Sequence, residues 1–292
     1  MVPGRRYSKS SLRHFQFLIA ATLLLPLLNA ESAARRLYQK TEYRAALAAL
    51  KPAESSDPAD WHLAGRALFQ LGEYKQAQEW FEKATRAEPK SAEHMLWLGK
   101  TFGRRAEHAS FVTAPKYAAE CRKAFEKAVD IDPRNLEAWS DLFEYYLSAP
   151  GFLGGGSDKA AGAAARIGRL DKAEGQYALA KLAEKKEDVA GAEKHWRAAI
   201  EWAPRNAGRW IDLATFLARL GRHPESDKAF EKAAEADPDA SARIWFARAE
   251  ANIEHKRNLG EARELLNRYL AAQVTPDDPS KSQARQLLKK IS

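Results

Sequence analysis

The side chains that most often carry chemistry are spread thinly along this chain. Its seven histidines form no metal-binding spacing such as H-E-x-x-H. Glu93-His94 and Glu107-His108 are adjacent pairs, whose side chains leave a helix in different directions, so we expect both pairs to be solvated surface. No G-x-S-x-G sequence is present to position a serine nucleophile. The sequence therefore predicts a protein that is not an enzyme, with no catalytic residues, no cofactor and no metal.

The glycine-rich segment at 151–156 has the most unusual composition in the chain. It does not fit the phosphate-binding pattern G-x-x-x-x-G-K-[ST]. A helix that follows it with Ser157 or Asp158 as N-cap would expose backbone N–H groups to an anion, although the Asp158 carboxylate would repel that anion. We favour a flexible turn that uses positive φ angles, with a small-ligand site as the alternative.

The composition is that of a globular protein, and the first 30 residues have the pattern of an export signal. The 292 residues are 45% hydrophobic and carry a formal charge of +8. Four basic residues precede an apolar run at 15–28, which is too short to span a bilayer and ends in Leu28-Asn29-Ala30. This pattern predicts a signal peptide at 1–30, and the alternative is an uncleaved anchor. Cleavage removes four of 47 basic residues and no acidic one, which leaves 43 against 39, a charge of +4. This excess is too small to favour nucleic acid as a partner.

A period of about 34 residues organises the rest of the chain. In residues 58–91, Trp61, Gly65 and Leu68 form one helical stripe, Phe81 belongs to a second, and Pro89 closes the unit. The pattern recurs through units at 92–135, 136–172, 173–206, 207–240 and 241–274, after a truncated unit at 32–57.

This pattern resembles the tetratricopeptide repeat (TPR), with its small residues at positions 8, 20 and 27, aromatic at 24 and proline at 32. The resemblance implies an all-α solenoid of helical hairpins, a right-handed superhelix of about six to seven repeats over residues 31–277. Residues 278–292 fit a polar capping helix, which the end of a solenoid needs for solubility. Cys121, the only cysteine, stands at a small buried position, so we expect a packing thiol.

The resemblance also implies a binding groove, because the concave face of TPR proteins is lined by positions 2, 5, 9, 12 and 13 of each first helix. Arg66, Lys100 and Arg104 would form a basic cluster there, suited to a carboxylate of an extended peptide. The candidate groove residues are His62, Arg66, Phe69, Lys100, Arg104, Glu144, Tyr177, Lys181, Lys185 and Arg219.

Two insertions distinguish this chain from a plain repeat array. One lies at about 105–116 and the other at about 148–157, and both fall at the same edge of neighbouring units. Insertions in repeat arrays often mark a binding face. Phe111, Phe152 and Leu153 are therefore candidates for an exposed apolar accessory edge.

The sequence favours a periplasmic adaptor that binds a protein or peptide partner in its groove. In the alternative, residues 15–28 stay uncleaved and tether a self-assembling scaffold to the inner membrane, which would be its only membrane contact. A solenoid that binds a small ligand through the glycine-rich segment is the third hypothesis. The pattern predicts neither the partner nor the oligomeric state.

Overall fold

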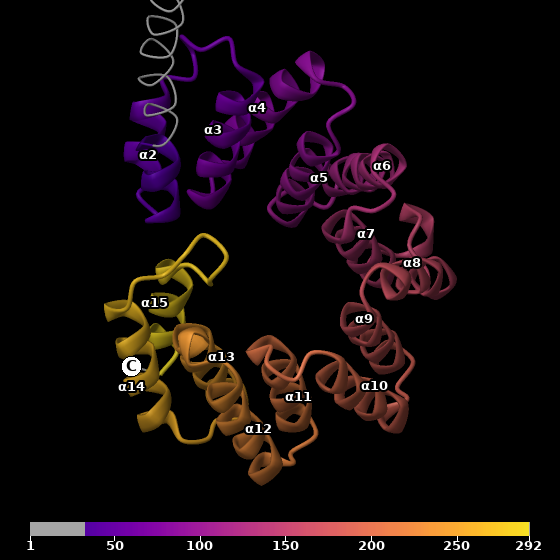
Figure 1. Ribbon diagram of the computed structural model, residues 1–292, viewed down its shortest axis with the longest axis vertical. Helices are drawn as coiled ribbons and strands as arrows, with labels where there is room; N and C mark the ends of the chain where they lie inside the picture. The colour runs from indigo at the N-terminus through magenta and orange to yellow at the C-terminus, as the bar shows by residue number, and fades with distance from the viewer. Residues whose placement is uncertain (1–32, 292) are drawn as a thin grey trace, which may run out of the picture.

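The computed structural model describes residues 33–291, and every regular element within that range is helical. The predicted signal peptide at 1–30 lies outside the described residues. Residues 33–39 are helical and are followed by the labelled helices of Figure 1. Their bounds are α2 Tyr43–Leu50, α3 Pro58–Gln70, α4 Tyr74–Ala87, α5 Ala92–Glu107, α6 Ala114–Ile131, α7 Leu136–Ser148, α8 Ser157–Leu170, α9 Lys172–Lys185, α10 Val189–Trp202, α11 Ala207–Arg219, α12 His223–Ala236, α13 Ser241–Glu254, α14 Leu259–Ala271 and α15 Lys281–Lys289.

The first helices of five successive hairpins begin at a polar N-cap residue, whereas α13 begins after Ala240 without a side-chain cap. The side chains of Asp57, Ser91, Asn135, Asp171 and Asn206 each accept a hydrogen bond from a backbone N–H in the first turn of α3, α5, α7, α9 and α11. These bonds satisfy N–H groups that have no partner within the helix. The caps therefore fix where these five units start.

The helices pack as consecutive antiparallel pairs, from α3 with α4 to α13 with α14. Figure 1 shows the pairs following one another around a ring, with α3, α5, α7, α9, α11 and α13 toward its centre and their partners outside. This arrangement confirms the predicted all-α TPR-type solenoid. Within residues 33–291, no helix is long and apolar enough to cross a membrane.

The ring is closed by a contact between its two ends. Gln70 Nε2 donates a hydrogen bond of 3.0 Å to the backbone oxygen of Pro276, which is 206 positions away in the chain. Figure 1 shows the segment between α14 and α15 beside α2 and α3. The concave face is therefore the inner wall of a ring rather than one side of an open spiral.

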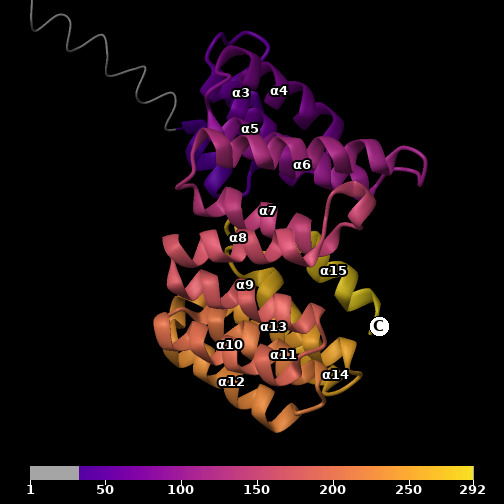
Figure 2. The ribbon, with the colours of Figure 1, turned by 90° about the vertical axis from the view of Figure 1, so that its right-hand side faces the viewer.

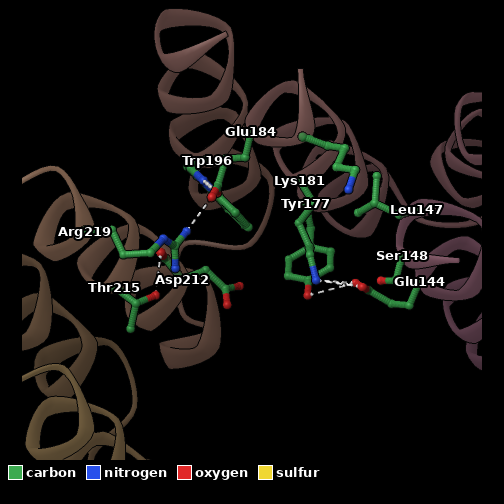
Figure 3. Close-up of a pocket in the computed structure, with 11 residues that line it drawn as sticks. Glu144, Leu147, Ser148, Tyr177, Lys181, Glu184, Trp196, Asp212, Thr215 and Arg219 are labelled. Carbon is green, nitrogen blue, oxygen red and sulfur yellow. Dashed lines mark hydrogen bonds and ion pairs between the residues drawn. The ribbon is translucent and has the colours of Figure 1, made fainter. Parts of the chain in front are cut away.

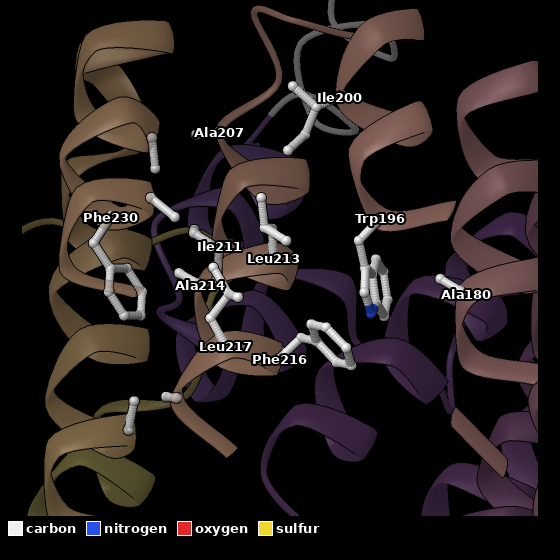
Figure 4. Close-up of a cluster of buried hydrophobic side chains, with 14 of the residues drawn as sticks. Ala180, Trp196, Ile200, Ala207, Ile211, Leu213, Ala214, Phe216, Leu217 and Phe230 are labelled. Carbon is white, nitrogen blue, oxygen red and sulfur yellow. The ribbon is translucent and has the colours of Figure 1, made fainter. Parts of the chain in front are cut away.

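The core runs along the solenoid as successive clusters of apolar side chains. In the first full unit, Phe81 has no exposed surface and its ring lies against Gly65, where an added Cβ would come within 2.8 Å of it. Gly99 and Phe125 repeat this arrangement in the next unit. Figure 4 shows the cluster around α11, where Trp196, Phe216 and other side chains from neighbouring helices interdigitate. Small residues thus allow the close approach of helices that aromatic rings then fill.

The first insertion lengthens two helices instead of forming a long loop. Helix α5 has 16 residues and α6 has 18, so only residues 108–113 lie between them. The two helices extend together because Arg105 on α5 donates to the Tyr117 hydroxyl on α6, at 2.5 Å. The hairpin consequently projects beyond its neighbours (Figure 2).

At the carboxyl end, α15 covers the last hairpin. Its Ala284 and Leu287 are buried in a cluster with Phe246 of α13 and Leu266 of α14. Ser280 and Gln283 form a capping box that fixes the start of α15. The outer side of α15 is polar, which is the property that a solenoid end requires.

Candidate functional site

Ion pairs between successive units line the concave face. Lys100 of α5 lies 2.6 Å from Glu137 and 3.3 Å from Asp141, both on α7. Lys181 of α9 in turn lies 2.6 Å from Glu144 of α7. Each cation is thus held by carboxylates of the neighbouring first helix. Two further pairs, Arg209 with Glu174 and Arg219 with Glu184, continue this pattern from α11 to α9.

A cavity of about 540 Å³ opens on this face between α7, α9 and α11 (Figure 3). Both charged and hydroxyl-bearing side chains from three consecutive units converge on it, beside the apolar Leu147 and Trp196. The lining residues are Glu144, Leu147, Ser148, Tyr177, Lys181, Glu184, Lys185, Trp196, Asp212, Thr215 and Arg219.

Two carboxylates set the polar walls of this cavity. Glu144 accepts from Lys181 Nζ at 2.6 and 2.7 Å and from the Tyr177 hydroxyl at 3.4 Å. Glu184 accepts from the indole Nε1 of Trp196 at 2.7 Å and also pairs with Arg219. Figure 3 shows the two groups on opposite sides of the cavity. The walls therefore present fixed acceptors and donors a few ångströms apart.

Asp212 lines this cavity and is half-buried. Burial raises its pKa to about 6, in spite of the Arg209 guanidinium at 3.1 Å, which favours the charged form. Glu174 and Glu184 raise the pKa further because they are like charges. A cationic or hydrogen-bond-donating group that enters the cavity would therefore stabilise the Asp212 carboxylate.

A second cavity of about 200 Å³ lies near the amino end, between residues 33–39, α3 and α5. His62 and His94 line it, and their Nδ1 atoms are 2.9 Å apart. Outer carboxylates complete a chain of four groups: His62 Nε2 is 3.2 Å from Glu93, and His94 Nε2 is 2.9 Å from Glu88. One histidine must donate and the other accept through Nδ1, so the pair accommodates a single shared proton.

Comparison with known proteins places this architecture in a family. A tetratricopeptide repeat model matches residues 58–101, and a second tetratricopeptide repeat model matches residues 177–241 and 212–279. The chain belongs to the tetratricopeptide repeat family. The search of curated proteins gave no match.

Solved TPR structures share the fold of this TPR protein. It is similar to a TPR protein from Parabacteroides merdae, with a TM-score of 0.59 and 13% identity over 90% of this chain and 97% of that one. It also resembles a thermophilic TPR protein from Thermus thermophilus, with a TM-score of 0.55 and 21% identity over 65% of this chain and 98% of that one. The TPR fold is a scaffold for protein–protein interaction.

The predicted groove residues of the TPR array divide between two places. Glu144, Tyr177, Lys181, Lys185 and Arg219 all line the cavity between α7, α9 and α11. His62 and Arg66 line the smaller cavity. Phe69 packs against the rings of Tyr74 and Trp97.

The predicted basic cluster of Arg66, Lys100 and Arg104 is neutralised in the structure. The Arg66 guanidinium lies over the rings of Tyr38 and Trp97, at 5.0 and 4.5 Å from their centroids. Lys100 is held by two carboxylates of α7, and Arg104 pairs with Glu107 of its own helix. A partner carboxylate would therefore have to compete with partners that are already in place.

The prediction that Glu93-His94 is solvated surface is wrong for the histidine. His94 is 6% exposed and His62 is 7% exposed. His94 turns inward because the first turn of α5 packs on α3, where His62 offers it a hydrogen-bonding partner. The glycine-rich segment also differs in detail: Gly156 is the N-cap of α8, at φ +138°, and Ser157 is the first helical residue. Gly154 is at φ +87°, so the turn does use positive φ angles.

Two side chains of the large cavity have roles that sequence reasoning misses. Asp212 carries no signal that separates it from a solvated acid, and Trp196 reads as packing alone, although its indole N–H also fixes Glu184. Cys121 is buried, as expected of a packing thiol, and burial raises its pKa to about 12. Among residues 33–291 no cluster of three metal-ligating side chains is present.

The buried His62 is expected to make folding stability fall with acidification. Burial lowers the pKa of His62 below 6.5, so the unfolded chain takes up a proton that the folded chain refuses as the pH drops through that value. We expect His62→Gln to reduce the fall in Tm between pH 7.5 and pH 5.5 by about 2 °C or more, as measured by circular dichroism. His108→Gln, at the turn after α5, is the control, and an equal fall in the two variants would contradict the assignment.

Proposed function

We propose that this TPR protein is a non-enzymatic adaptor that holds an extended peptide segment of a protein partner along the inner wall of its ring. The cavity between α7, α9 and α11 is the central subsite. The observation that carries the proposal is the convergence of side chains from three successive first helices on one cavity of about 540 Å³. A cavity of this size accommodates two or three side chains of a peptide.

The chemistry of the walls supports a polar, extended ligand. Opposite charges alternate along the face, so each segment of a peptide meets both donors and acceptors. Asp212 and Lys185 line the cavity with charges that a ligand can approach, while Tyr177 and Trp196 supply apolar area. Such mixed surfaces favour register and selectivity over raw affinity.

The aliphatic hydroxyl groups in the cavity, those of Ser148 and Thr215, are poorly placed for nucleophilic chemistry. Thr215 Oγ1 donates to the backbone oxygens of its own helix, at 3.0 Å from Ile211. A nucleophile requires an adjacent base, and Ser148 has no hydrogen-bonded base among the described residues. These features favour binding without turnover.

We further propose that the protein is exported and acts in the periplasm. The support is the sequence of residues 1–30, with its basic start, short apolar run and small residue at position 30. Sequencing the mature amino terminus tests cleavage: a chain that starts near Glu31 supports an exported, cleaved protein, and one that starts at Met1 rules out cleavage and favours the anchor. A protein found in the cytoplasm after cell fractionation overturns export itself.

Charge removal in the cavity tests the adaptor proposal. Affinities for an array of 15-residue peptides from envelope proteins are measured with the wild type and with Lys181→Met/Arg219→Met, which keeps the alkyl stems. We expect binding of selected peptides to weaken about tenfold or more in the double variant. Arg86→Met, on the outer helix α4, is the matched control and should bind like the wild type. Equal binding by all three proteins, or no binding peptide at all, overturns the proposal.

A further inference from the structure

The projecting edge of the ring carries large apolar side chains in open solvent. Phe111 is 90% exposed, Val112 is 69% exposed and Phe152 is 83% exposed. Phe111 and Val112 occupy the tip between α5 and α6, and Phe152 lies in the short 3-10 helix Gly151–Leu153 that precedes α8. Side chains so fully exposed contribute nothing to the core, and their grouping marks an interaction surface.

The two tips belong to one surface. The 3-10 helix packs on α6, where a Cβ added to Gly154 would meet Arg122 Nε at 2.8 Å. The Tyr145 hydroxyl fixes this segment by donating to the backbone oxygen of Leu153 at 2.9 Å. Arg122 lies eight residues beyond the start of α6, about 12 Å along the helix from the end that carries the first tip. Figure 2 shows both segments at the same edge of the molecule.

A basic hollow lies at the base of the first tip. It has a volume of about 340 Å³ and its lining includes Lys75, Arg105 and His108, together with the hydroxyl groups of Thr113 and Tyr117, and no carboxylate. The inner wall of the ring differs, because Lys100, Lys181, Arg209 and Arg219 there each pair with a carboxylate.

Arg105 shows this contrast most directly. Its guanidinium donates to two neutral groups, the Gln78 side chain and the Tyr117 hydroxyl. Within the described part of the chain no carboxylate pairs with Arg105 or Lys75, which line the hollow, or with Lys116, which lies outside its lining in the first turn of α6. The nearest acid in sequence, Glu107, is itself paired with Arg104. The hollow therefore holds positive charge that an anion can neutralise.

We propose that this edge is a peripheral binding surface for an anionic lipid bilayer. Phe111, Val112 and Phe152 enter the interfacial region, and Lys75, Arg105 and Lys116 face the phosphate groups of the lipid heads. Apolar side chains that project from a cationic base match the layered chemistry of a bilayer surface, with its anionic heads above an apolar interior. This surface shares no lining residue with the cavity between α7, α9 and α11.

A probe at the tip distinguishes this surface from any effect of the amino-terminal segment. The full chain with Val112→Cys is labelled with an environment-sensitive fluorophore, since Cys121 is buried. Vesicles of phosphatidylcholine with about 30% phosphatidylglycerol should shift the emission of the probe to the blue. Their surface is anionic, like that of natural membranes. Vesicles of phosphatidylcholine alone should shift it far less. A probe at Arg86→Cys, on the outer surface of α4, should not respond to either vesicle.

Variants then separate the two components of binding. Phe111→Ser/Phe152→Ser should abolish the shift at the probe, and Lys75→Gln/Lys116→Gln should weaken vesicle affinity about tenfold or more, with the loss reduced at high salt. Soluble glycerophosphate at millimolar concentration should leave the shift unchanged. No blue shift at the tip with anionic vesicles, or displacement by glycerophosphate, overturns the proposal. A blue shift of the tip probe that is produced by a protein partner and not by anionic vesicles would also contradict the proposal of a lipid-binding surface.

Discussion

Replacing Phe81 with alanine is expected to lower the free energy of unfolding by about 3–5 kcal/mol. The ring has no exposed surface and fills the space above Gly65, against the rings of His62 and Trp97 at 5.3 and 6.0 Å between centroids. Alanine would leave a cavity there, because the glycine backbone on the other side cannot extend to fill it. Urea denaturation followed by circular dichroism measures the change.

Phe111→Ala provides the matched control, since the same residue type stands 90% exposed at the projecting edge. We expect it to change the free energy of unfolding by less than about 0.5 kcal/mol. The loss of stability from Phe81→Ala should be greatest in the repeat that contains it and in the adjacent repeats, because each repeat contacts only its neighbours. Hydrogen exchange should therefore accelerate most in α3, α4 and α5. Equal effects of the two substitutions would contradict the packing described here.

Gly175→Ala is expected to destabilise the protein by about 1–3 kcal/mol, although alanine is the better helix former. Helices α8 and α9 cross so closely that a Cβ on Gly175 would lie 2.4 Å from the Cα of Gly168. The obstacle is backbone, so relief requires the two helices to move apart. The measurement is again the midpoint and slope of urea denaturation.

Gly162→Ala is the control for this substitution. Gly162 lies within α8, and an added Cβ there meets nothing within 4 Å. We expect it to stabilise the protein by up to about 1 kcal/mol, the usual difference in helix propensity between glycine and alanine. Opposite signs for the two variants support the close crossing, and a stabilising Gly175→Ala would refute it.

The repeat pattern predicted the fold because it records packing that is local in sequence. Gly65 with Phe81, and Gly99 with Phe125, are pairs within one hairpin, so their spacing is visible in the chain itself. The closing of the ring could not be read in this way. Its hydrogen bond joins Gln70 to Pro276, and the small rotations between units that bring these residues together leave no mark at any one position.

The ion pairs of the inner wall are partly predictable from the sequence, more so than the closing of the ring and less so than the hairpin packing. Position 9 of one unit carries a cation where position 2 of the next carries a carboxylate, as in Arg66 with Glu93, 4.0 Å apart, and Lys100 with Glu137. Comparing these positions across units would have predicted that the basic cluster is neutralised. The contact between the two buried histidines is harder to predict from the sequence, because His62 and His94 stand at different positions of their units. Only the packing of α5 on α3 brings them together.

Site-specific photo-cross-linking tests whether a partner peptide lies along the inner wall of the ring. A photoreactive amino acid replaces Thr215, which lines the large cavity, and in a second protein it replaces Arg86 on the outer surface of α4. After illumination in the cell envelope, we predict a discrete cross-linked product at Thr215 that disappears in the Lys181→Met/Arg219→Met background, and none at Arg86. A product at Arg86 alone, or one at Thr215 that is unaffected by the double substitution, would contradict the account.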